Sequence, residues 1–347
     1  MKTTFKISSI LGCVALAASL QASAQADIHF SQFYETSILR NPSLTGIFSN
    51  DYKVGAYYRN QWSSISNPFV TNVAFAEVRM PVGHVSDDYV SFGFLGYTDK
   101  AGSLDQKISS IYPALNYSKS LNPDHNTYLS VGFTGGYTQY SFDPSKVTVD
   151  NQYLGGAFNA LNPTNETFKN TKMTMWDLGA GINYNSSTGT NNSITYILGI
   201  SGYHLTQPKF SYNSIPGITQ NMRWNLNGAI GFNIQENIVT QVHTNLALQG
   251  AYIESITGVL TTFSEAGGGE HPAYALTGGL FYRLGDALIP VVRLKYKNTS
   301  IGASYDVNIS KLKQASKLRG GYEITLSLSG DFTNKSGILK KTVCPKF

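Results

Sequence analysis

Residues 127–142 of the chain read TYLSVGFTGGYTQYSF, and apolar side chains alternate along this stretch with small or polar ones. Leu129 and Val131 belong to the apolar set, whereas Ser130 and Gly132 belong to the small or polar set. Because successive side chains of a β-strand point to opposite faces, the stretch predicts a strand with one apolar face and one small or polar face. A barrel wall between lipid and a wet lumen requires these two faces, although a strand of a β-sandwich also alternates.

The same alternation recurs along the chain, for example in YVSFGFLGYTD (89–99) and MWDLGAGINYNSS (175–187). Such lengths suit tilted transmembrane strands of about 9–11 residues better than sandwich strands of about 5–6 residues. An even strand number is expected when both chain ends lie on the periplasmic side. We therefore predict an all-β fold, a single transmembrane antiparallel β-barrel of about fourteen strands that begin near residues 51, 69, 88, 107, 126, 175, 193, 219, 237, 255, 272, 287, 298 and 320.

The amino-acid composition favours the same fold. Only 14% of the residues are charged, and the chain contains 33 Gly, 22 Tyr and 18 Phe. After the first 24 residues, no apolar stretch reaches the roughly 18–20 residues that a spanning helix needs. Low charge with many aromatic residues and glycines is typical of a transmembrane barrel. Two secreted β-sandwiches in tandem are the alternative.

Residues 1–24 have the parts of a secretory signal peptide, with Lys2 and Lys6 before a short apolar core and an A-x-A site at its end. Cys13 lies inside the apolar core and not after it, which argues against a lipoprotein. Removal of this segment takes away two lysines and leaves 24 basic and 21 acidic residues, a net charge of +3. This charge is too mild to predict a nucleic-acid partner. Cys344 is then the only remaining cysteine, so we predict no disulfide within the mature chain.

We predict that residues 25–347 form one outer-membrane domain whose barrel wall spans about 51–330. The last strong strand reads RGGYEITLSLSG (319–330), and we expect the barrel to close near Leu328. Residues 331–347 would then form a basic periplasmic tail outside the wall.

The six histidines do not form a recognisable enzyme motif, since none lies in an HExxH sequence. The chain also lacks a GxSxG motif and a P-loop. Ser201 and His204 lie close in sequence, but their odd offset places them on opposite faces of an undistorted strand. We therefore predict no catalytic residue, no metal site and no cofactor, and an enzyme is the weakest of the functions considered.

Four segments, in order, resemble the PorP/SprF family of Bacteroidetes outer-membrane proteins. They are DIHFSQFYETSILRNPSLTGIFSNDYKVGAYYRNQW (27–62), GISGYHLTQPKFSY (199–212), FYRLGDALIPVVRLKYKNTSIGASYDVNISKLKQASKLRGGYEITLSL (281–328) and CPKF (344–347). Together they extend over the mature chain from end to end.

The resemblance implies an integral outer-membrane barrel of the type IX secretion system that is not an enzyme. It implies a partner outside the cell, namely a secreted protein with a type B C-terminal sorting domain, often an adhesin used in gliding motility. It also implies periplasmic partners, since the PorP branch associates with the periplasmic ring and an OmpA-like peptidoglycan-binding protein. The alternative function is an outer-membrane porin or small-molecule uptake channel, which the same alternation would support.

The resemblance divides the chain by side of the membrane. Loops 143–174 and 264–271 would face outward and touch the exported partner, whereas segment 27–50 and tail 331–347 would face the periplasm or plug the lumen. Asn41-Pro42 and the segment around His204 are also expected to form turns. The candidate partner-binding residues are His204, Gln207, Pro208, Lys209, Asn41, Pro42, Cys344, Pro345 and Phe347.

Overall fold

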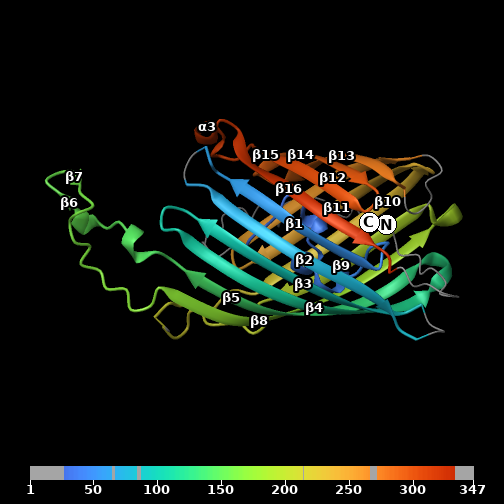
Figure 1. The fold of residues 1–347 in the computed structure, drawn as a ribbon, viewed down its shortest axis with the longest axis horizontal. Coiled ribbons are helices and arrows are strands. Elements are labelled where there is room, and N and C mark those ends of the chain that lie inside the picture. The colour runs from blue at the N-terminus through green and yellow to red at the C-terminus, as the bar shows by residue number, and fades with distance from the viewer. Residues whose placement is uncertain (1–26, 65–66, 84–86, 214, 266–271, 333–347) are drawn as a thin grey trace, which may run out of the picture.

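A computed structural model describes residues 27–64, 67–83, 87–213, 215–265 and 272–332, which form a closed antiparallel barrel of fourteen strands (Figure 1). Each strand pairs with its neighbours in chain order, and the last strand closes onto the first, from Tyr52 opposite Gly330 to Gln61 opposite Gly321. The wall consists of β1 (Tyr52–Gln61), β2 (Phe69–Pro81), β3 (Tyr89–Ala101), β4 (Gln106–Asn122), β5 (Thr127–Ser141), β8 (Lys172–Thr188), β9 (Ile194–Tyr203), β10 (Arg223–Gln235), β11 (Ile238–Gln249), β12 (Tyr252–Ser264), β13 (Tyr274–Arg283), β14 (Ala287–Tyr296), β15 (Thr299–Asn308) and β16 (Arg319–Gly330).

The predicted barrel is confirmed, and its predicted strands begin within four residues of the observed ones. The largest difference is at β10, which begins at Arg223 and not near 219, because Lys209 and Thr219 first form a separate bridge. The wall ends at Gly330, close to the predicted closure, and the rest of the tail from residue 333 lies outside the described residues. The predicted signal peptide lies outside them too.

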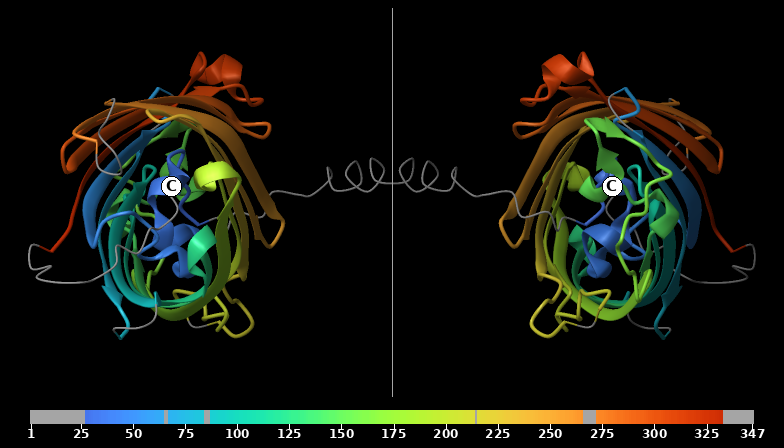
Figure 2. Two further views of the ribbon diagram at one scale, coloured as in Figure 1. Left: turned by 90° about the vertical axis from the view of Figure 1, so that its right-hand side faces the viewer. Right: turned by 90° about the vertical axis from the view of Figure 1, so that its left-hand side faces the viewer.

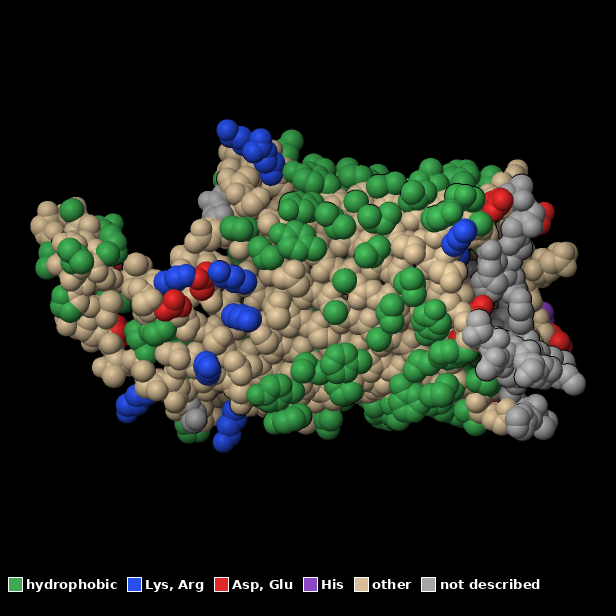
Figure 3. Space-filling model, in the orientation of Figure 1, with side chains coloured by type: hydrophobic (Ala, Val, Ile, Leu, Met, Phe, Trp, Pro, Cys, Tyr) green, Lys and Arg blue, Asp and Glu red, His purple; other side chains and the backbone are tan. Residues whose placement is uncertain are grey.

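The alternation of side chains matches the two faces of the wall. Phe133 and Leu178 point outward and are 57% and 56% exposed, whereas Ser130 and Asn183 point inward and are fully buried. Figure 3 shows hydrophobic side chains spread over the outer wall, with most of the visible charged side chains near its two ends. No helix within the described ranges is long and apolar enough to cross a membrane.

Short elements outside the wall lie in the N-terminal segment and in the connections. Each strand runs from one end of the barrel to the other, and neighbouring strands are antiparallel. The connections therefore alternate between two ends of the barrel. We name the end that carries the 142–171 connection the loop end, and the end where β1 begins and β16 finishes the terminal end. These elements are η2 (Phe33–Glu35), α2 (Ser37–Arg40), η3 (Pro42–Leu44), η4 (Pro123–His125), η5 (Pro144–Lys146), η6 (Asp150–Gln152), η7 (Thr190–Asn192), α3 (Lys313–Ser316) and the small hairpin of β6 (Tyr153–Leu154) with β7 (Ala157–Phe158).

One predicted loop placement is wrong. Loops 143–174 and 264–271 were expected on the same outward side, but the first follows the fifth strand of the wall and the second follows the tenth. The connection between Ser264 and Tyr274 therefore lies at the terminal end, although residues 266–271 themselves lie outside the described part. An odd difference in strand number places two connections at opposite ends.

Candidate functional site

Residues 27–50 pass through the lumen from the loop end to the terminal end, and we name them the plug (Figure 2). At the loop end, the main-chain nitrogen of Asp27 donates to Gln249 at 3.0 Å. At the terminal end, Arg79 donates to the carbonyl of Phe48 at 3.0 Å. Two positions were predicted for this segment, the periplasmic face and the lumen, and in the structure it lies in the lumen.

Glycines on the inner face of the wall make room for the plug. A Cβ atom at Gly132 would collide with the backbone of Pro42 and Ser43, and one at Gly181 would collide with the amide of Asn41. At Gly93 a Cβ atom would lie 2.7 Å from Ile38. The inner face of the wall, which carries the small side chains, therefore packs against a segment of the chain itself.

Asn41 fastens the plug to the wall at mid-lumen. Its side-chain nitrogen lies 3.3 Å from the carbonyl oxygens of both Ile182 and Ile200, to which it donates, and 2.9 Å from Asn227. Its side-chain oxygen accepts from the main-chain nitrogen of Ser43 at 3.0 Å, which caps η3. Asn41 is fully buried, so no surface of it is open to an outside protein in this structure. Neighbouring Pro42, also buried, begins η3 and forms the expected turn.

A buried ion cluster holds the plug nearer to the loop end. The main-chain nitrogens of Ser31 and Gln32 donate to the Glu323 carboxylate at 2.7 and 2.8 Å. Glu323 also forms an ion pair with Arg59. Arg59 and Arg283 both reach Asp306, at 3.1 and 3.0 Å. The two arginines and two carboxylates are each at most 4% exposed. Arg283 also lies 3.6 Å from Glu254 and 3.0 Å from Asp286, so each buried arginine is paired with carboxylates, as buried ions require.

A third fastening lies at the mouth of the loop end and involves predicted residue His204. Its Nε2 atom lies 2.7 Å from Asp27 of the plug, and its Nδ1 atom lies 2.8 Å from Asp177 of β8. Ser201 instead donates to the carbonyl of Arg40 at 3.0 Å. The expectation that Ser201 and His204 face opposite sides is wrong, since both are buried. The strand ends at Tyr203, and His204 has a φ of 56°, which breaks the alternation.

The charges at this mouth stabilise one another. Burial alone would lower the pKa of His204, but the carboxylates of Asp27 and Asp177 outweigh burial and raise it to about 10. Burial alone would raise the pKa of Asp27, but His204 and Arg223 outweigh it and lower the pKa to about 2. At neutral pH the contact therefore joins an imidazolium to two carboxylates and is an ion contact that ties the plug to the wall.

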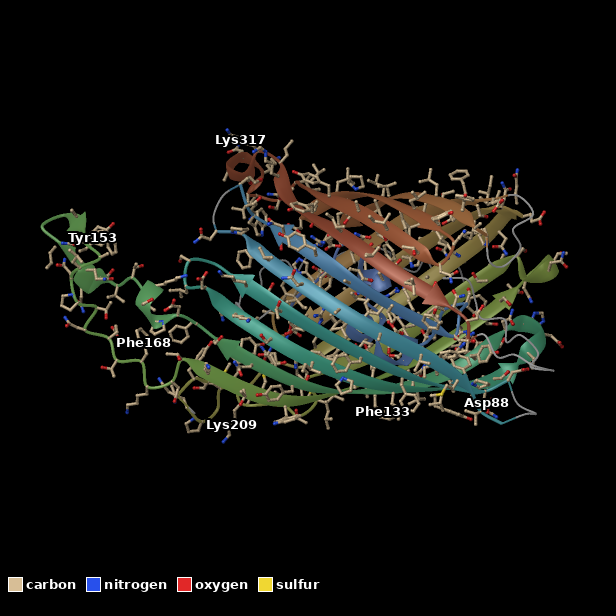
Figure 4. All side chains as sticks on the ribbon, in the orientation of Figure 1. Asp88, Phe133, Tyr153, Phe168, Lys209 and Lys317 are labelled. Atoms are coloured by element: carbon tan, nitrogen blue, oxygen red, sulfur yellow. The ribbon has the colours of Figure 1, made fainter. Side chains whose placement is uncertain are left out.

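The 142–171 connection extends as an arm beyond the barrel and ends in the β6–β7 hairpin (Figures 1 and 4). Its base is packed, with the ring of Phe142 against those of Phe168 and Tyr212. Its tip is organised by Gln152, whose side chain donates to the carbonyl of Asn162 at 3.2 Å. The tip nevertheless leaves apolar side chains in solvent, namely Tyr153 (62% exposed), Leu154 (66%), Phe158 (43%) and Leu161 (92%).

The other predicted site residues fall in two places. Gln207, Pro208 and Lys209 belong to the 204–222 connection at the loop end, where Gln207 and Lys209 are exposed. The main-chain nitrogen of Gln207 donates to the carbonyl of His204 at 2.9 Å and forms the expected turn, and the carbonyl of Pro208 accepts from the main-chain nitrogen of Gln220 at 2.9 Å. Their contact with a partner stays a prediction. Cys344, Pro345 and Phe347 lie outside the described residues.

Sequence reasoning missed the buried ion cluster and the apolar tip. A signal for the cluster was present, because Arg59 and Glu323 are charged residues at inward positions of their strands. A signal for the tip was also present, because YLGGAF (153–158) interrupts a stretch rich in Asn and Thr. In the ranges that the structure covers, no group of three or more His, Cys, Asp or Glu side chains is arranged to hold a metal ion.

Solved structures similar to this one are outer-membrane barrels. A mutant of the TodX monoaromatic hydrocarbon channel that lacks S2 and S3 matches with a TM-score of 0.55 and 9% identity, over 92% of this chain and 98% of that one. A second TodX mutant, which lacks S2, matches with a TM-score of 0.52 and 10% identity, over 85% of this chain and 94% of that one. At these identities the likeness concerns the fold alone. No protein with a curated description matches the chain.

The sequence also matches the model of a protein family over residues 22–328, which include the plug and nearly the whole wall. The family is described as the type IX secretion system membrane protein PorP/SprF. The resemblance of the N-terminal, internal and C-terminal blocks within this range is therefore confirmed. The chain belongs to the PorP/SprF family of type IX secretion system membrane proteins and folds as an outer-membrane β-barrel.

Proposed function

We propose that this protein is an accessory barrel of the type IX secretion system that binds a secreted protein at the cell surface and helps to export or anchor it. The observation that carries the proposal is the plug, which the wall holds at the mouth, in the ion cluster and at Asn41. A lumen occupied in this way favours binding at the rim over free diffusion through the pore. Family membership supports a role in secretion and not in catalysis.

The secreted partner proposed here carries a type B C-terminal sorting domain, as a gliding adhesin of Bacteroidetes does. Since both ends of the wall lie at the terminal end, that end faces the periplasm and the loop end faces outward. The arm then reaches into the medium with four apolar side chains at its tip, a composition that suits contact with another protein. Lys209 and Gln207 lie on the same outer end.

Export requires the predicted signal peptide at residues 1–24, and we propose that it is cleaved. On the periplasmic side, tail 331–347 with Cys344, Pro345 and Phe347 is proposed to dock on secretion components. Candidates of suitable position are the periplasmic ring and an OmpA-like peptidoglycan-binding protein. Deletion of residues 340–347 is expected to impair partner function and to leave insertion of the barrel intact.

The direct test is purification of a tagged barrel in mild detergent, followed by mass spectrometry of the proteins that accompany it. We expect a large secreted protein with a C-terminal sorting domain. Recovery of the barrel alone after gentle extraction would contradict the proposal. A planar-bilayer recording tests the alternative, because a porin or uptake channel would show steady conductance that a plugged barrel lacks.

A further inference from the structure

The lumen contains a cavity between the plug and the wall. It has a volume of about 220 Å³, and its lining includes Glu35 and Arg40 of the plug, Lys53 of β1 and Ser329 of β16. Because β1 begins and β16 finishes at the terminal end, the cavity lies in the terminal half of the lumen. Asn50, where the plug ends, also lines the cavity and is partly exposed. In the proposed orientation the cavity therefore faces the periplasm.

The charged side chains around this cavity are mostly basic. The lining has two carboxylates, Glu35 and Glu77, and four cations, namely Arg40, Lys53, Arg293 and Lys295. Glu35 is 5% exposed and forms ion pairs with Lys53 at 2.7 Å and with Arg293 at 2.5 Å. Four positive charges against two negative ones leave an excess of two positive charges on the lining.

Arg40 is a buried cation without a carboxylate beside it among the described residues. It is 8% exposed, and its Nη2 atom donates to the carbonyl oxygens of Thr244 at 3.1 Å and Gly228 at 3.4 Å. Its Nε atom has no hydrogen-bond partner in the described part of the chain. Buried charges are normally paired, because an unpaired charge keeps the cost of leaving water. Arg40 therefore has both a charge and a donor available for an anion.

Lys295 is the second cation of the cavity without a carboxylate. It lies one residue before the end of β14, opposite Ser300, which also lines the cavity. Its side chain is partly exposed, and it forms no ion pair with any residue that the structure describes. Arg40 instead contacts the middle of β10 and β11. Lys295 therefore lies toward the mouth of the cavity, and Arg40 lies in its interior.

The lining suits a small oxyanion. Neutral donors accompany the cations, namely the hydroxyl groups of Ser37, Ser49, Thr262, Thr277, Ser300 and Ser329. A phosphate group carries a charge of about −1.5 to −2 at pH 7 and several acceptor oxygens, which matches this excess charge and these donors. Water could fill a polar cavity, but it would not offset the charge. The volume is below the roughly 300 Å³ of sites for drug-sized ligands, so the ligand would be small.

We propose that this cavity binds a phosphate group, as the free ion or as a small phosphate monoester, with Arg40 as its anchor and Lys295 as the cation that attracts it from the periplasm. Arginine pairs with phosphate through several N–H groups, whereas lysine acts as a point charge. The chain's own tail is a poor occupant, because residues 333–347 contain four lysines and no Asp or Glu. The inference goes beyond the proposed function, since it does not depend on the exported partner.

Isothermal titration calorimetry of the purified full-length barrel, in a detergent without phosphate, tests the proposal. Inorganic phosphate and glycerol 3-phosphate are compared with succinate, all at equal ionic strength in a chloride buffer. We expect both phosphates to bind, and to bind more tightly than succinate. Binding of glycerol 3-phosphate alone would identify the ligand as an ester. Phosphate should also raise the unfolding temperature relative to chloride, because a ligand of the folded state stabilises it.

Two variants and a control locate the site. Arg40→Gln removes the anchor and is expected to weaken phosphate binding about tenfold or more. Lys295→Gln removes the cation at the mouth and is expected to weaken it about two- to fivefold. Lys313→Gln removes an exposed cation of α3 at the loop end and should leave the affinity unchanged. If Arg40→Gln does not fold, Lys295→Gln still provides the test, because its side chain forms no ion pair among the described residues.

Two results would overturn the proposal. In the first, the wild-type barrel binds neither phosphate above the chloride background, or binds succinate more tightly. In the second, no folded variant at Arg40 or Lys295 binds phosphate more weakly than the wild type. Neither result changes the expected co-purification of the secreted protein, so failure of this inference is distinguishable from failure of the proposed function.

Discussion

The plug and the loop end differ in which side chains they bury. In the plug, Ser31 and Asn41 are fully buried and their polar groups bond to the wall. At the loop end, Leu154 is 66% exposed and Leu161 is 92% exposed. Burial of satisfied polar groups gives a fixed structure, whereas exposed apolar groups favour contact with another molecule. The comparison assigns stability to the lumen and recognition to the rim.

The largest effect is expected from breaking the buried ion cluster. Glu323→Ala would leave Arg59 without one carboxylate and the main-chain nitrogens of Ser31 and Gln32 without their acceptor. We expect a loss of about 3–5 kcal/mol in the free energy of unfolding, measured from denaturant titration of the purified barrel. Outward-facing Ile324→Val is the control and should change it by less than about 0.5 kcal/mol. Equal stability of the two variants would show that the ion cluster does not stabilise the folded barrel.

A smaller effect is expected where the plug touches the wall through a glycine. Gly132→Val would force the Pro42 backbone away, whereas in Gly135→Val the new Cβ atom meets no other atom within 4 Å. We expect Gly132→Val to cost about 1–3 kcal/mol and to raise the conductance in a planar bilayer. Gly135→Val, on the same strand, should leave the conductance unchanged. The same conductance from both variants would argue against close packing of the plug.

The contact at the mouth should give a pH dependence of intermediate size. The pKa of His204 is raised from 6.5 to about 10, so its contribution to stability is full below pH 6.5 and is lost as the pH rises through 10. The pKa of Asp27 is lowered from 3.8 to about 2, so its contribution is full above pH 3.8 and is lost as the pH falls through 2. We expect the unfolding temperature to fall between pH 6.5 and 10, and His204→Gln to reduce this fall. Exposed His125→Gln is the control, and an unchanged alkaline fall in His204→Gln would contradict the assignment.

The smallest effect on stability is expected at the apolar tip of the arm. Leu161→Ser changes a side chain that is 92% exposed, so the free energy of unfolding should stay within about 0.5 kcal/mol of the wild type. Co-purification of the secreted partner should nevertheless decrease. Leu312→Ser, at another exposed apolar position of the loop end, is the control. If Leu161→Ser lowers the stability and keeps the co-purified partner, the assignment of recognition to the rim is contradicted.

The wall of the barrel could be predicted because its signal is local. Alternation such as that of Leu129 and Ser130 depends only on neighbouring residues, and it recurs in strand after strand. The placement of loop 264–271 failed for a different reason. Its side of the membrane follows from counting the strands before it, and the predicted count already placed it opposite loop 143–174.

The candidate site could be predicted only in part. The resemblance drew attention to Asn41 and His204, but it did not show that both hold the plug. Asn41 bonds to Ile182 and Ile200, and His204 to Asp27, which are distant in sequence. The rule that residues an odd number apart face opposite sides of a strand also failed for Ser201 and His204. No local pattern predicted that His204 has a φ of 56°.

By itself, the sequence determined an outer-membrane barrel of about fourteen strands that closes near Leu328, because period-two alternation and strand length are encoded residue by residue. Only the tertiary structure decided that residues 27–50 occupy the lumen, since their partners lie on strands that are far apart in the sequence. It also decided that the ladder between β8 and β9 begins only at Ala180, because the extent of a ladder depends on the length of the neighbouring strand.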